Sequence, residues 1–115
     1  MRRITLLVMM LFCGALGAAE LRLPAGFVET AAPERGSWRQ WGEIPLTYAV
    51  TRNRVDLVLR QQGWRKQKTV EFDRIRWKSL EVWSRGRQRI LVQYWRLEVA
   101  LTGVAWGELT EEKKS

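Results

Sequence analysis

Carboxylates are the residues with which this 115-residue chain could do acid–base chemistry, because it has no histidine and only one cysteine, Cys13. Imidazole bases and thiolate metal sites are therefore missing. The sequence also contains no phosphate-binding glycine motif, and we predict no cofactor and no metal. The candidate pairs are Glu71 with Asp73, two apart on one strand, and Glu81 with Glu98 across strands. Residues two apart share a strand face, which suits catalysis but is equally typical of a solvent-facing strand. We predict that the protein is not an enzyme, with a carboxylate-only enzyme as the least favoured alternative.

Tryptophan and basic residues are interleaved along the chain, a pattern that suits binding. Four of the seven tryptophans are followed directly by Lys or Arg, which on a strand can simply place Trp inside and the base outside. Residues 82–83 and 94–95 break this rule, because two adjacent apolar residues place apolar groups on both faces. Some Trp is then expected at the surface beside basic residues. The predicted binding residues are Trp83, Arg85, Arg87, Arg89, Trp95, Arg76 and Lys78.

Residues 1–19 have the three-part pattern of a cleavable secretory signal peptide. Two arginines open the segment, an apolar run follows, and Gly17 and Ala19 occupy the small-residue positions before a cut at Glu20. The apolar run is shorter than the about 20 residues of a membrane anchor, and Cys13 lacks the small preceding residue of a lipid-attachment motif. We predict export to the periplasm or the medium. The mature chain then has no cysteine and a formal charge of +6, since two arginines leave with the signal.

The rest of the chain divides into a lead-in, one domain and a tail. Residues 20–44 contain two of the three prolines and three glycines without a sustained period, and we interpret them as irregular, with one short strand near residues 26–29. Residues 45–109 carry regular patterns and form the predicted domain. Residues 110–115 are a charged, solvated tail.

A helix is the favoured interpretation of residues 45–63. It places Tyr48, Val55 and Leu59 on one face, together with Val58. Gly63 follows as the expected stop, because glycine takes the left-handed conformation at little cost. The competing interpretation is a strand through residues 55–59, which alternate and are rich in β-branched side chains.

Alternating apolar residues predict antiparallel strands after Gly63. Residues 64–73 and 77–84 alternate, and Gly86 lies between two β-prone runs, which predicts a tight hairpin that pairs residues 78–84 with 88–95. Both faces are apolar from residue 90 to 103, which is typical of a central strand. Its faces exchange near residues 94–96, where we predict a bulge, and residues 104–109 add a last short strand.

The predicted fold is therefore α+β, a small two-layer domain with one helix packed on a three- to four-stranded antiparallel sheet. The favoured function is an exported, non-catalytic accessory or interaction protein of the bacterial cell envelope, which docks on an envelope protein through its basic Trp/Arg surface. The alternative is a module that binds an anionic envelope glycan or lipid, including peripheral membrane contact. Export disfavours nucleic acid, although its phosphates and bases suit such a surface. The partner and the oligomeric state stay open.

Overall fold

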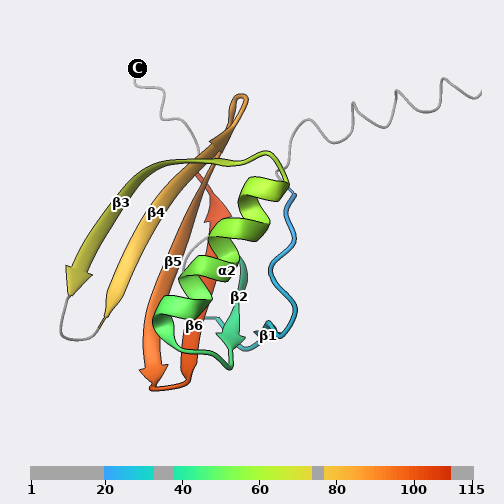
Figure 1. The fold of residues 1–115 in the computed structure, drawn as a ribbon. Helices are drawn as coiled ribbons and strands as arrows, with labels where there is room; N and C mark the ends of the chain where they lie inside the picture. Colours follow the sequence, from blue (N-terminus) through green and yellow to red (C-terminus); the bar gives the residue numbers. More distant parts are fainter. Residues whose placement is uncertain (1–19, 33–37, 74–76, 110–115) are drawn as a thin grey trace, which may run out of the picture.

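Six antiparallel strands form one sheet, and a single helix lies across one of its faces (Figure 1). The computed structural model describes residues 20–32, 38–73 and 77–109, so the predicted signal peptide, the tail and Arg76 lie outside the described residues. The order across the sheet is β1-β2-β6-β5-β4-β3. The elements in chain order are β1 (Val28–Glu29), β2 (Trp38–Ile44), α2 (Tyr48–Gln61), β3 (Arg65–Asp73), β4 (Lys78–Arg85), β5 (Gln88–Glu98) and β6 (Leu101–Glu108).

The predicted three- to four-stranded α+β domain is wrong, because the sheet has six strands and the described part of the chain is mostly β. Of the two additional strands, β1 lies where one short strand was predicted near residues 26–29, and β2 lies in the part of residues 20–44 that was predicted to be irregular. The sequence of β2 does not alternate regularly, because a bulge between Trp38 and Gln40 shifts the register of this strand against β6. Gly42 marks a close approach rather than a turn, since a Cβ there would collide with the Val28 carbonyl and the Phe27 ring.

The turn between β5 and β6 also differs from the prediction, which ran one strand from residue 90 to 103. Glu98 pairs with Leu101, and Val99 and Ala100 form the two-residue connection. This connection contains no Gly, Pro, Asn or Asp, the residues by which a turn is recognised in a sequence. The predicted bulge near residues 94–96 corresponds to a register shift between Arg96 and Glu98.

The helix and the Gly86 hairpin agree with the sequence. Thr47 caps α2 by accepting a hydrogen bond from the Val50 amide, and Gly63 follows the helix with a φ of +92°. β4 and β5 pair directly across Gly86, which has a φ of +65°, a conformation that favours glycine. The helix therefore replaces the competing strand through residues 55–59.

The hydrophobic core lies between α2 and the sheet face that it covers. Its largest fully buried side chains are Trp64, Trp83 and Tyr94, which pack with Val55 and Leu59 of the helix. No described helix or strand covers the opposite face of the sheet, as Figure 1 shows. Within the same ranges, no helix has the length and apolar character needed to cross a membrane. On this face, apolar side chains are therefore not covered by any other described helix or strand.

Candidate interaction surface

The face of the sheet opposite α2, here termed the open face, has a mainly apolar centre. Directly paired residues of antiparallel strands share a face, so the pairing of Trp41 with Ala105, Ala105 with Gln93 and Gln93 with Leu80 defines one row across four strands. Most other side chains in the centre of this face are apolar or glycine. By the same pairing, the open face includes Trp38, Trp41, Glu43, Arg65, Lys68, Val70, Lys78, Leu80, Val82, Arg89, Leu91, Gln93, Trp95, Gly103, Ala105 and Gly107.

Three tryptophan rings contact one another in series on the open face. The Trp38 and Trp41 ring centroids are 5.7 Å apart, and those of Trp41 and Trp95 are 4.6 Å apart. The Trp95 ring lies over Gly103, where even a methyl group would collide with it. All three tryptophans are half-buried, so part of each remains accessible. The rings form a continuous aromatic surface across β2, β6 and β5.

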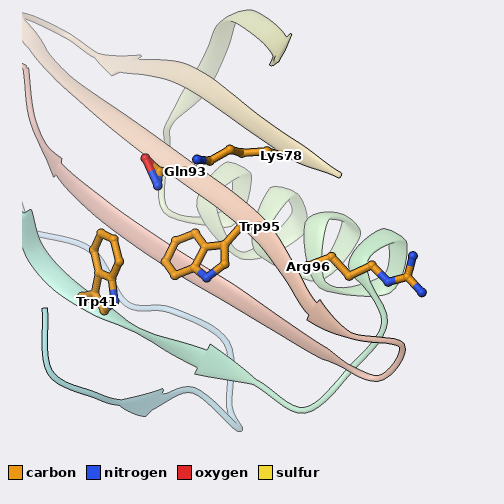
Figure 2. Close-up of a pocket in the computed structure, with 5 residues that line it drawn as sticks. All are labelled: Trp41, Lys78, Gln93, Trp95 and Arg96. Carbon is orange, nitrogen blue, oxygen red and sulfur yellow. The ribbon is translucent and has the colours of Figure 1, made fainter. Parts of the chain in front are cut away.

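A shallow hollow of about 290 Å³ lies beside these rings. Figure 2 shows Trp41 of β2, Trp95 of β5 and Lys78 of β4 around it, with Gln93 beside the end of the lysine side chain. The fifth lining residue, Arg96, extends away from the two tryptophans, and its guanidinium lies 5.2 Å from the Trp77 ring. The hollow thus combines aromatic carbon, a carboxamide and one ammonium group.

Charged groups surround the apolar centre of the open face without neutralising one another. Lys68, Lys78 and Arg89 lie on this face together with Arg65, while Glu43 is the acidic residue on β2. None of these five groups forms an ion pair with another residue in the described ranges. Their charge is available to an external partner.

The helix side of the sheet carries a buried ion network instead. Glu81 is 2% exposed, and its Oε2 accepts a hydrogen bond from Arg52 at 3.2 Å and lies 3.6 Å from Lys66 Nζ. Its Oε1 accepts hydrogen bonds from Trp83 Nε1 at 3.0 Å and from the Tyr94 hydroxyl at 3.3 Å. Both carboxylate oxygens are satisfied, so this glutamate stabilises the helix–sheet interface and has no free oxygen for a reaction.

Four groups in this interface have shifted pKa values, Tyr48, Arg52, Asp56 and Tyr94. Burial raises the pKa of Tyr94 well above its usual value, and the adjacent Glu81 carboxylate acts in the same direction. Burial alone would raise the pKa of Asp56, but hydrogen bonds from Arg60 and Lys66 outweigh it and lower that pKa. These shifts favour a neutral Tyr94 hydroxyl and an ionised, ion-paired Asp56, which suits groups that stabilise the fold.

The carboxylate pairs suggested by the sequence are not assembled. Glu81 lies on the helix side, whereas Glu98 pairs with Leu101 of the open face. The backbones of Glu71 and Asp73 pair with the consecutive residues Ser79 and Lys78 of β4, so a register shift interrupts the regular two-residue spacing on which this pair was predicted. No group of three potential metal-ligating residues occurs in the described part of the chain.

Trp83 is not a surface residue, and its predicted exposure is wrong. Its side chain is fully buried, paired with Ile90 on the helix side of the sheet. Lys66 and Arg60 lie 5.5 and 5.4 Å from its ring. The adjacent apolar residue, Val82, is the one that reaches the open face. The basic–aromatic interleaving here is an internal cation–π contact.

The other predicted binding residues fall in different places. Trp95 and Lys78 are cross-strand neighbours on the open face, and Arg89 lies on the same face nearer the Gly86 turn. Arg87 is exposed in that turn. Arg85 instead lies 4.4 Å from the Trp64 ring and donates a hydrogen bond to the Gln62 carbonyl. Among the predicted binding residues that the structure describes, only Trp95 and Lys78 therefore form a cross-strand pair.

Trp38 and Trp41 are the tryptophans of this surface that the sequence prediction missed. Their spacing of three would place them on opposite faces of a regular strand, and the bulge restores them to one face. A signal was present in β6, where Gly103, Ala105 and Gly107 alternate with larger residues. Small residues at every second position indicate a strand face over which neighbouring side chains lean.

Comparisons of the chain with protein-family models, with curated proteins and with solved structures found no match. The functional argument therefore depends on the open face itself.

Proposed function

We propose that this chain is an exported, non-catalytic interaction protein of the bacterial cell envelope, and that another protein chain covers its open face. The observation that carries the proposal is the series of three half-buried tryptophans on a sheet face that no described element covers. Tryptophan buries a large apolar area and is enriched at binding hot spots. Apolar patches that are large and exposed mark interaction sites on soluble proteins.

The arrangement of charge supports a protein partner. The apolar rings and Leu80, Val82 and Leu91 occupy the centre, while Lys68 and Arg89 lie toward the margin. An apolar centre with a polar rim is the usual anatomy of a protein interface.

Contacts of the first described residues support removal of the signal peptide before Glu20. Leu21 and Leu23 pack against the core, and the backbone of Arg22 exchanges hydrogen bonds with the Gln62 side chain at 2.8 and 2.9 Å. A cut before Glu20 leaves every one of these contacts in the mature protein. Intact-mass measurement of protein from an exporting host tests this, and a full-length or lipidated species would contradict it.

Photo-crosslinking in the native host tests the proposed function. One variant carries a photoreactive amino acid in place of Gln93, in the centre of the open face. The control variant carries it in place of Asn53, on the exposed surface of α2. We expect position 93, but not position 53, to give a discrete protein adduct of defined mass. Equal adduct patterns at both positions, or no protein adduct at position 93, would overturn the proposal.

An anionic glycan or lipid is the second candidate, because Arg65, Lys68, Lys78 and Arg89 form no ion pairs within the described ranges. Binding to such a polymer or surface depends on charge and weakens steeply as salt is added. Binding that survives high salt favours the protein partner, whereas its loss favours the anionic ligand.

A further inference from the structure

The identity of the chain that covers the open face follows from how its residues are distributed across the sheet. This inference rests on the proposed function and names the partner. We propose that the partner is a second copy of this chain, packed open face to open face about a two-fold axis that runs along the strands between β5 and β6. Two-fold dimers are the commonest protein assemblies, and each presents one self-complementary patch.

The strand order makes such an axis geometrically simple. The four central strands are β2, β6, β5 and β4, so an axis between β6 and β5 has two strands on each side. Rotation about it places β6 over β5 of the second copy, and β2 over β4. Aligned sheets pack about 10 Å apart at about 30°, which keeps strands near the axis opposite one another.

Charge complementarity is the main argument for this axis. Glu43 on β2 and Lys78 on β4 belong to one row, linked through Gly103 and Trp95. They lie on opposite sides of the axis, each in the second strand from it. The rotation therefore sets Glu43 against Lys78 of the second copy, and by symmetry does so twice. Neither group forms an ion pair with a described residue of its own chain.

Two of the remaining cations of the face, Arg65 and Lys68, are not forced together by this arrangement, whereas Arg89 lies on β5, next to the axis, and approaches Arg89 of the second copy. Lys68 and Arg65 lie on β3, whose counterpart across the axis is β1, a strand of only two residues. Lys68 and Arg65 therefore lie at the rim of the dimer, where solvent reaches them.

Side-chain size is also complementary across the same axis. β6 presents Ala105 and Gly107 on the open face, and β5 presents Gln93 and Leu91 in the matching rows. The small residues of one copy thus face the larger ones of the other. Trp95 leans over Gly103 toward the axis, so the two Trp95 rings meet there. The Gln93 carboxamides also approach the axis, and each has the donor and acceptor needed to pair with its mate.

Charge reversal combined with analytical ultracentrifugation tests the dimer. The full chain is expressed in an exporting host, and the purified protein is measured from about 1 to about 200 µM, a range that covers a modest protein–protein affinity. We expect a dimer that dissociates at least tenfold more readily in Glu43→Lys and in Lys78→Glu, and recovers in the double variant. Glu29→Lys is the matched control, because it makes the same charge change at an exposed residue outside the proposed interface. Val28 pairs with Glu43, whereas Glu29 pairs with Gly42 and so lies on the other face of the sheet.

The outcomes separate the dimer from the proposed function. A wild-type protein that is monomeric throughout this range, or a dimer that neither single reversal weakens, overturns the dimer. Crosslinking at position 93 then decides the proposed function independently, because an adduct with a different protein preserves it and the absence of any protein adduct overturns it. Circular dichroism of each variant confirms that lost association is not lost folding.

Discussion

The two faces of this sheet are built from alternate residues of the same strands but manage charge and tryptophan differently. On the helix side, Trp83 is fully buried, and the Glu81 carboxylate beside it is satisfied by Arg52 and Lys66. On the open face, the tryptophan rings contact other tryptophan rings. None of them has a cation–π contact with a described residue. A tryptophan next to a basic residue in the sequence is therefore part of the core on one face and part of the accessible surface on the other.

This difference shows how a structural face can be told from a binding face. On the structural face, charged side chains are paired within the chain, whereas those described on the proposed binding face are not. On the helix side, Arg52 and Lys66 have carboxylates within 4 Å, so removing either partner leaves a charge poorly compensated. On the open face, Glu43, Lys68 and Lys78 form no ion pair within the described residues, so replacing them removes no stabilising charge contact there. Stability should therefore respond strongly to substitutions on one face and weakly to those on the other.

The largest expected effect comes from truncating one tryptophan on each face. Trp83→Ala removes a fully buried ring and should lower the free energy of unfolding by about 3–5 kcal/mol. Trp95→Ala removes a half-buried ring and should cost about 1 kcal/mol. Guanidinium unfolding of dilute protein measures both. Equal losses would show that the open face is as structural as the helix side.

A matched pair of glutamates gives the next largest effect. Glu81→Gln leaves Arg52 and Lys66 without their shared buried carboxylate, and we expect a loss of about 2 kcal/mol in unfolding free energy. Glu43→Gln on the open face should stay within about 0.5 kcal/mol of wild type. Urea unfolding at constant salt compares the two. A larger loss at Glu43 would reverse the assignment of the faces.

Gly103→Ala sharpens the description of the open face. The added methyl group displaces the Trp95 ring, which can swing toward solvent, so we expect a cost of about 1 kcal/mol and loss of the Trp41–Trp95 contact. Acrylamide quenching of tryptophan fluorescence should increase. Gly86→Ala is the control, since it strains a turn with positive φ and has no atom within 4 Å of the new Cβ. The free energy of unfolding of Gly86→Ala should fall by a similar amount, but acrylamide quenching of its tryptophan fluorescence should not change.

The smallest expected effect is a dependence of stability on pH that comes from Asp56 on the helix side. The pKa of Asp56 is lowered, so its contribution is complete above the unfolded value of about 4 and is lost as pH falls through the lower folded value. This partly exposed group should contribute less than about 1 kcal/mol. The difference in unfolding free energy between wild type and Asp56→Asn should be constant above pH 5 or so and shrink below pH 4. A difference that grows on acidification would contradict the sign of the shift.

Local patterns determined several elements from the sequence alone. The 3.6 period ending at Gly63 predicted α2, and Gly86 between two β-prone runs predicted the β4–β5 hairpin. These features depend on backbone conformations that nearby residues set, such as the positive φ that Gly63 and Gly86 adopt. Strands β3, β4 and β5 were also located within a few residues of their observed bounds.

Only the tertiary structure decided the number of strands and the location of the aromatic surface. β2 is held by its pairing with β6, a strand about 60 residues away in sequence, and its bulge hides the alternation that would have revealed it. That bulge brings Trp38 and Trp41 to one face, whereas the phase of β4 against β5 sends Trp83 into the core. A strand exposes either of two faces depending on where the helix packs, and no residue within the strand encodes that choice. The sequence therefore determined that tryptophan and basic residues are neighbours, and the packing of α2 decided which of them a partner can reach.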